Sequence, residues 1–153
     1  MSPSTDRIEK KILLRAPRAR VWRAISDAGE FGTWFGLKLE GTFAPGAHIK
    51  GKILHPDYAH LPFKILIDRV EPERLLSWRA PPHPEAQGMS SPEVPTTQVV
   101  FTLEDAPGGT LLTVVESGFD EIPLARRAEL YRGNEEGWTI QLGNIERHVS
   151  PAA

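Results

Sequence analysis

The last part of the chain holds one long amphipathic segment, and this segment most constrains the fold. Between Pro123 and Pro151, a stripe of mostly apolar residues recurs at steps of three or four: Leu130, Asn134, Trp138, Leu142, Ile145 and Val149. This spacing places them on one face of an α-helix. A helix with such a stripe must bury it against another element. The sequence therefore predicts a sheet whose inner face packs on this C-terminal helix.

The residues before this helix predict short strands joined by tight turns. The expected strands cover residues 8–15, 37–43, 47–55, 63–70 and 75–79, then one that ends near Glu104, then 110–117. Turn signals at Pro45-Gly46, at residues 71–74 and at residues 106–109 separate them, which favours an antiparallel sheet. A helix begins at Pro17, where a missing N–H is tolerated, and a short helical turn follows over residues 30–33.

Composition narrows the class of protein. The 153 residues fit one domain, residues 1–153, with a core of about 8–149. The Pro-rich loop 81–95 fits no regular element, so it is either a functional lid or an insertion without order. A formal charge of -2 offers no basic field for nucleic acid, and the absence of cysteine excludes disulfides and thiolate chemistry. No secretory signal or membrane-length apolar run is present, so we expect a cytoplasmic protein without membrane insertion.

Three sets of short motifs occur in a recognisable order. They are Ala16-Pro17, Val21-Trp22 and Trp34-Phe35-Gly36, then Val70-Glu71-Pro72 before Leu75 and Trp78, then Gly109-Thr110, Glu116-Ser117-Gly118-Phe119 and Gly137-Trp138. Their order and spacing resemble the SRPBCC superfamily, which is START-like and polyketide-cyclase-like. The subgroup is the one similar to the C-terminal domain of the activator of heat shock protein 90 ATPase. The resemblance covers roughly residues 8–149.

The resemblance implies an α+β helix-grip fold, a curved antiparallel sheet of about six or seven strands around the long C-terminal helix. Two short helices follow the first strand. It also implies a hydrophobic cavity between sheet and helix that binds a small hydrophobic or amphipathic ligand, such as a lipid, a sterol-like or a polyketide-like molecule. One fold carries many functions. An accessory protein acting on a chaperone ATPase through surface contacts, and a cyclase- or hydrolase-type enzyme, therefore remain alternatives. No cofactor is expected, and the oligomeric state is left open.

Large aromatic residues are the candidates for the wall of the cavity: Trp34, Phe35, Trp78, Phe101 and Trp138. For each of them alone, filling of the core is the favoured explanation, since large aromatics dominate core energetics. As a set on this fold they favour a cavity, because ligand pockets combine apolar walls with a few polar anchors. Gln141 and Leu142, on or beside the helix stripe, are further candidate ligand contacts.

Glu116 is the most informative polar candidate. Leu112, Val114 and Glu116 share one face of a strand, so an inward face would put a carboxylate at the edge of the cavity. A buried carboxylate is costly unless it is paired, which would indicate a functional anchor. In the other interpretation the strand ends there and Glu116 is solvated. Asn134 would reach Glu116 or a ligand, or else a carbonyl at the end of a strand.

Histidine chemistry rests on His55, which shares a strand face with Ile49, Gly51 and Ile53. It would contact a ligand or serve with Glu116 as a weak candidate for a general base, although a structural role is the alternative. The spacing of His55, Asp57 and His60 matches no standard metal site, so no metal is predicted.

Gly133, Gly137 and Gly143 each cost about 1 kcal/mol of stability in a helix, which indicates either close approach to the sheet or space for a ligand.

Overall fold

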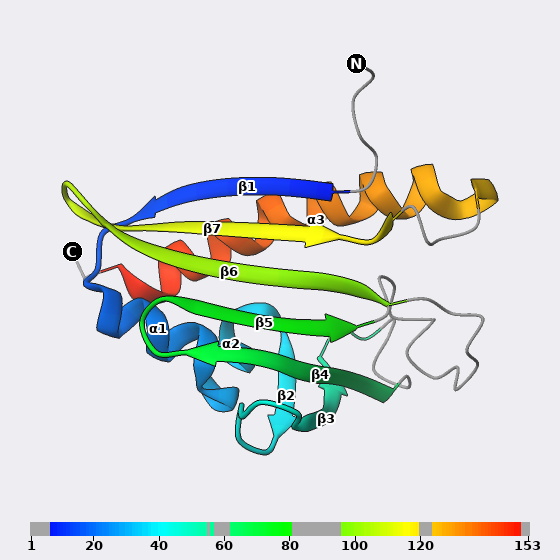
Figure 1. Ribbon diagram of the computed structural model, residues 1–153, viewed down its shortest axis with the longest axis horizontal. Coiled ribbons are helices and arrows are strands. Elements are labelled where there is room, and N and C mark those ends of the chain that lie inside the picture. The colour runs from blue at the N-terminus through cyan, green and yellow to red at the C-terminus, as the bar shows by residue number, and fades with distance from the viewer. Residues whose placement is uncertain (1–6, 55, 57–61, 81–95, 120–123, 151–153) are drawn as a thin grey trace.

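The computed structural model describes residues 7–54, 56, 62–80, 96–119 and 124–150 (Figure 1). In chain order the elements are β1 (Arg7–Leu14), α1 (Arg18–Ser26), α2 (Ala28–Phe35), β2 (Leu37–Glu40), β3 (His48–Ile53), β4 (Pro62–Glu71), β5 (Leu75–Ala80), β6 (Thr97–Ala106), β7 (Gly109–Ser117) and α3 (Leu124–Val149). His55, Asp57, His60 and the Pro-rich loop 81–95 lie outside the described residues.

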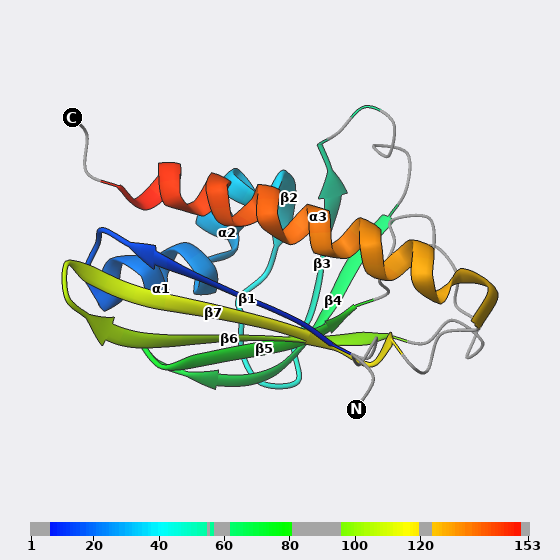
Figure 2. The same ribbon diagram turned by 90° about the horizontal axis from the view of Figure 1, so that it is seen from above.

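The seven strands form one antiparallel sheet in the order β1-β7-β6-β5-β4-β3-β2. The first two strands of the chain therefore lie at opposite edges, and α1 and α2 carry the chain from one edge to the other. Figures 1 and 2 show α3 lying along one face of the curved sheet, with α1 and α2 beside its C-terminal half. The predicted α+β helix-grip fold is confirmed.

Local signals explain most boundaries of the two short helices. Pro17 is extended and forms the N-cap of α1, so the helix begins at Arg18, one residue later than predicted. Asp27 ends α1 and also caps α2, because its Oδ2 accepts a hydrogen bond from the Glu30 N–H at 2.9 Å. Gly36 ends α2 in the left-handed region, with φ 92°. The sequence predicted only a helical turn over residues 30–33, because Asp27 was interpreted as an end signal alone.

The core lies between the sheet and the three helices. The inward faces of β6 and β7 alternate strictly, with buried residues at every second position from Thr97 to Leu103 and from Thr110 to Glu116. On the other side of the fold, α2 packs tightly on β2: a Cβ at Gly32 would lie only 2.3 Å from the Leu37 carbonyl oxygen. This close contact fixes the aromatic end of α2 over the inner face of the sheet.

None of the helices in the described residues is long and apolar enough to cross a membrane.

Candidate functional site

The register of the sheet places two buried polar groups in one inward-facing row. Ile8 pairs with Glu116, Glu116 with Val99, Val99 with Trp78, and Trp78 with Ile67. Glu116 and Trp78 are each 4% exposed and sit two strands apart, at a separation of roughly 10 Å between their strands. Three apolar side chains complete the row. Glu116 and the indole N–H of Trp78 therefore lie at the same level of the sheet.

Glu116 faces α3 and is fully engaged by neutral donors. Trp138 Nε1 donates to its Oε1 at 2.8 Å, and Asn134 Nδ2 lies 3.1 and 3.0 Å from the two carboxyl oxygens. Thr97 Oγ1, on the neighbouring strand, donates to Oε2 at 2.5 Å. We call these four residues the Glu116 site. The open question of the sequence analysis is thereby resolved: Glu116 points inward, and Asn134 reaches it.

Burial raises the pKa of the Glu116 carboxyl, while the hydrogen bonds from Thr97, Trp138 and Asn134 act in the opposite direction without cancelling the effect. No basic side chain among the described residues compensates a negative charge there. An unpaired buried charge is costly. The buried carboxyl of Glu116 therefore keeps its proton to a higher pH than a solvent-exposed glutamate does.

The hydroxyl of Thr97 also fits a protonated Glu116. It lies 3.4 Å from the carbonyl oxygen of Ala80 as well as 2.5 Å from Glu116 Oε2, and its single hydrogen serves one acceptor at a time. With the proton on Oε2, Glu116 donates to Thr97 and Thr97 donates to Ala80, so each group is satisfied. The local geometry therefore favours the neutral acid.

Trp78 carries the second polar group of the row. Its indole Nε1–H is buried and has no hydrogen-bond partner among the described residues. Its ring lies between Phe31 and Phe101, with centroid distances of 6.2 Å to each. Leaving such a donor unpaired costs on the order of 1–3 kcal/mol. An acceptor supplied from outside the chain would recover this energy.

The predicted wall residues form a continuous set of ring contacts. Phe101 lies 5.7 Å from Trp138, and Trp138 lies 5.9 Å from Phe35, between ring centroids. Phe35 is 5.5 Å from Trp34, and Phe31 stacks on Phe35 at 4.8 Å. Trp34 is held in place because its Nε1 donates to the Ala24 carbonyl at 2.8 Å. The structure thus brings the predicted aromatic residues together between sheet and α3, with Phe31 as an added member.

The remaining candidates on α3 divide between core and interface. Leu142 is buried in the hydrophobic core. Gln141 Nε2 donates to the Phe35 carbonyl at 2.9 Å, so this residue connects α3 to the end of α2. Added Cβ atoms at Gly133 and Gly137 would meet no atom within 4 Å among the described residues. Close approach to the sheet is therefore not the reason for these two glycines, and Gly133 is exposed to solvent.

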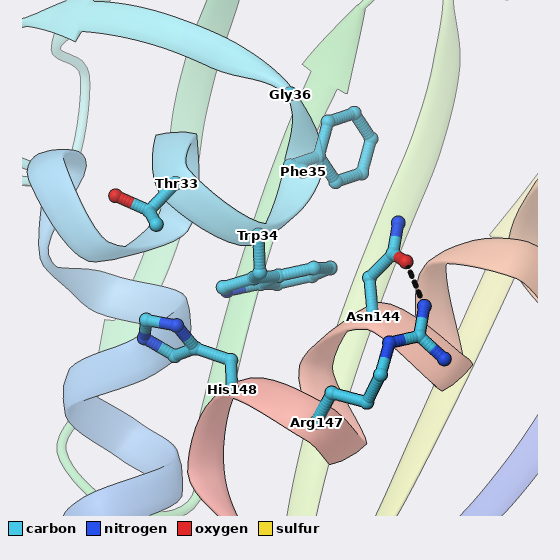
Figure 3. Close-up of a pocket in the computed structure, with 7 residues that line it drawn as sticks. All are labelled: Thr33, Trp34, Phe35, Gly36, Asn144, Arg147 and His148. Carbon is cyan, nitrogen blue, oxygen red and sulfur yellow. Dashed lines mark hydrogen bonds between the residues drawn. The ribbon is translucent and has the colours of Figure 1, made fainter.

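A pocket opens at the surface between the end of α2 and the last turns of α3 (Figure 3). Its volume is about 470 Å³, and its lining consists of residues 33–36, Asn144, Arg147 and His148. In Figure 3, Trp34 lies between the side chain of His148 and that of Asn144. We call this site the α2–α3 pocket. Trp34 and Phe35, predicted as walls of a cavity between sheet and helix, pack in or against the core and also line this surface pocket.

An ion cluster borders the α2–α3 pocket. Glu30 accepts hydrogen bonds from Arg20 at 2.6 Å and Arg23 at 2.7 Å, and His148 Nε2 lies 2.9 Å from it. Burial acts to raise the pKa of Glu30, but these hydrogen bonds outweigh it and hold the pKa below its usual value. Arg23 is largely exposed, with 61% of its side chain accessible, while Arg20 is half-buried between Glu30 and the end of α3.

Sequence reasoning missed Thr97, and it gave no role to Asn144 or Arg147. The alternation of β6 marks Thr97 as inward-facing, so its place on the same face as Phe101 was an available signal. Arg147 and Asn144 carried no such signal, because their roles depend on how α2 packs against α3.

Within the described ranges, no group of three or more histidine or acidic side chains could hold a metal ion.

Comparison with known proteins supplies the family. The family model described as "Activator of Hsp90 ATPase homolog 1-like protein" matches residues 15–150. A search of curated proteins gives no significant match. Among solved structures, protein MLL2253 from Mesorhizobium loti is 24% identical, with a TM-score of 0.74, and the match covers 93% of this chain and 95% of that one.

Two further structures share the fold. DynU16, a protein of the dynemicin biosynthetic locus, is 27% identical with a TM-score of 0.70, and the match covers 95% of this chain but 47% of DynU16. The Aha1 dimer from Colwellia psychrerythraea is 14% identical with a TM-score of 0.72, over 94% of this chain and 96% of that one. The match of the family model spans most of the chain. The chain therefore belongs to the family of Activator of Hsp90 ATPase homolog 1-like proteins.

Proposed function

We propose that this protein binds a small apolar or amphipathic molecule between the inner face of the sheet and α3. The observation that carries the proposal is the buried, unpartnered Nε1–H of Trp78, in the same row as Glu116. A ligand with a hydrogen-bond acceptor and an apolar body would satisfy this donor and contact Phe101 and Trp138. The proposal treats residues 1–153 as one ligand-binding domain.

The polar groups support a neutral ligand rather than a charged one. The Glu116 carboxyl is already hydrogen-bonded to three side chains, so a ligand ammonium would have to displace one of them. An anionic group would lie near a carboxyl that has no neighbouring cation among the described residues. A ketone, ester or amide carbonyl suits Trp78 because it accepts a hydrogen bond without carrying a charge.

A matched pair of probes tests this directly. Fluorenone carries a carbonyl on a flat apolar body, and fluorene has the same body without the acceptor. We expect native mass spectrometry and ¹⁵N NMR to show tighter binding of fluorenone, with the Trp78 indole resonance shifting on binding. Trp78→Phe should abolish the preference for fluorenone while Trp22→Phe, on α1, keeps it.

Two negative results together would refute the proposal. Neither probe binds, and a broader set of fatty alcohols, sterols and aromatic ketones also leaves the Trp78 resonance unchanged. Equal binding of the two probes to the unsubstituted protein would refute the role of the Trp78 donor. Circular dichroism of both variants checks that the fold is retained.

A second candidate function is accessory action on a chaperone ATPase, and the family supports it. Such a protein would act through its surface, so its effect should survive Trp78→Phe. The test is the steady-state ATPase rate of the host's Hsp90-type chaperone with and without this protein. An unchanged rate, together with no complex in gel filtration, would exclude this function.

General-base catalysis is a weaker candidate. His55 lies outside the described residues. A substrate proton would have to compete with Thr97, Asn134 and Trp138 for the oxygens of Glu116. Turnover of a discovered substrate that is lost in Glu116→Gln but kept in Thr97→Val would nevertheless assign Glu116 that role.

A further inference from the structure

The α2–α3 pocket contains a guanidinium that is held in position but carries no compensating charge. Arg147 Nη2 donates to Asn144 Oδ1, and Asn144 Nδ2 donates to Gln141 Oε1 at 3.0 Å. Gln141 Nε2 in turn donates to the Phe35 carbonyl at 2.9 Å. This chain of hydrogen bonds anchors Arg147 to the end of α2. Figure 3 shows the guanidinium beside Asn144, at the edge of the pocket.

The guanidinium of Arg147 packs over Gly143 and has a neutral hydrogen-bond partner. A Cβ at Gly143 would lie 3.5 Å from Arg147 Nη1, so the guanidinium lies over this glycine. Its only side-chain partner in the described part of the chain is the neutral amide of Asn144. Because the head group is already ordered, less rotamer entropy is lost when a ligand binds to it.

The neighbouring negative groups are already compensated. The Glu30 carboxylate is engaged by Arg20, Arg23 and His148. Arg20 Nη2 also donates to the His148 carbonyl oxygen at 3.3 Å, where the helix dipole of α3 has its negative end. The positive charge of Arg147 therefore remains available to an anion in the pocket.

Opposite Arg147, the pocket has an aromatic wall. Trp34 is fixed by its hydrogen bond to Ala24, and Phe35 is fixed by stacking on Phe31. The volume of about 470 Å³ is in the range of small-molecule sites. A planar carboxylate matches the fork of a guanidinium, and one carboxylate matches one uncompensated cation.

We propose that the α2–α3 pocket binds a small aromatic carboxylate, whose carboxylate pairs with Arg147 and whose ring contacts Trp34 and Phe35. This site is separate from the row of Glu116 and Trp78. It takes an anion where the interior takes a neutral molecule, so either site can fail its test without affecting the other.

Benzoate is the smallest probe with both features, and benzamide is the uncharged control of the same shape. We expect a ¹⁵N NMR titration with benzoate to give saturable shifts at the Trp34 indole N–H, the backbone of residues 33–36 and Arg147 Nε–H. Benzamide should bind at least about tenfold more weakly, because hydrogen bonds to a charged group are worth more than neutral ones.

Arg147→Gln should weaken benzoate binding by about tenfold or more. Arg132→Gln removes an exposed cation elsewhere on α3 and serves as the matched control, which should leave the affinity unchanged. Circular dichroism verifies folding of both variants. The proposal is overturned if millimolar benzoate produces no saturable shift in the pocket, if benzamide binds equally well, or if the two arginine variants lose the same affinity.

Discussion

Replacing Glu116 with glutamine tests whether the buried carboxyl is a neutral acid in the folded protein. Glutamine keeps the shape of the protonated side chain. Its carbonyl oxygen can accept from Trp138 Nε1–H, and its amide group can donate to Thr97, as the protonated acid does. The variant differs from the natural protein mainly in that it cannot ionise. Its effect on stability should therefore depend on pH in a defined direction.

The direction follows from the raised pKa of Glu116 in the folded state. Above the pKa of the unfolded chain, about 4.3, the unfolded glutamate releases its proton while the folded one retains it. The folded state then binds more protons than the unfolded state, so stability falls as pH rises. The slope is at most about 1.4 kcal/mol per pH unit, and the fall ends once pH exceeds the folded pKa.

Urea denaturation at a series of pH values from about 5 to about 8 measures this effect. Near pH 5, we expect the unfolding free energies of Glu116→Gln and the natural protein to differ by about 1 kcal/mol or less. As pH rises, the difference should move steadily in favour of the variant. Glu104→Gln, at an exposed position of β6, is the matched change of charge and controls for general electrostatic effects.

Two results would refute the reasoning. A difference between Glu116→Gln and the natural protein that stays constant with pH would mean that folding does not change the protonation of Glu116. A difference that moves in favour of the natural protein would mean that the folded site stabilises the carboxylate as an anion, through its hydrogen-bond donors, more than burial destabilises it. Either outcome would also remove the support that the Glu116 site gives to a neutral ligand.

Four further substitutions test other contacts by urea denaturation. Trp138→Phe removes the indole N–H that donates to Glu116 and should lower the free energy of unfolding by about 2 kcal/mol. An unchanged free energy of unfolding would mean that this hydrogen bond contributes nothing. Glu30→Gln should cost about 1 kcal/mol at neutral pH, and the cost should disappear as pH falls through the lowered pKa of Glu30; a cost that persists in acid would contradict its ionic origin. Gly32→Ala places a methyl group 2.3 Å from a backbone oxygen and should destabilise by more than about 2 kcal/mol, whereas Gly133→Ala, with open space around it, should stabilise by about 0.5–1 kcal/mol; equal effects would show that the close contact is not limiting.

The sequence predicted the elements well where a periodic pattern determines them. The step of three or four residues from Asn134 to Val149 predicted α3, and the alternation from Leu112 to Glu116 predicted that these residues share one face of β7. These patterns are reliable because one face of each element must be apolar, whatever its neighbours are. The extent of α2 was underestimated, because Asp27 serves two helices and a local pattern does not show this.

The candidate site was predictable only in part. Glu116 and Asn134 were identified, but whether Glu116 is buried was left open, because period two does not say which end of a strand a helix covers. Thr97 and Trp138 become its donors through the register of β6 with β7 and the path of α3. The unpartnered donor of Trp78 cannot be inferred from sequence, since any tryptophan carries the same N–H.

The sequence by itself determined which residues share a face of each strand and helix, because local periodicity carries that information. The order of its motifs resembled a known family, and that resemblance implied the helix-grip architecture. Tertiary structure decided which side chains meet. His148 contacts Glu30 across 118 positions of the chain, and Arg147 is anchored to Phe35 through two amide side chains. The physical reason is that hydrogen bonds and ion pairs act over a few ångströms. A shift of α3 along the sheet by one turn would keep every periodic pattern and change all of these partners.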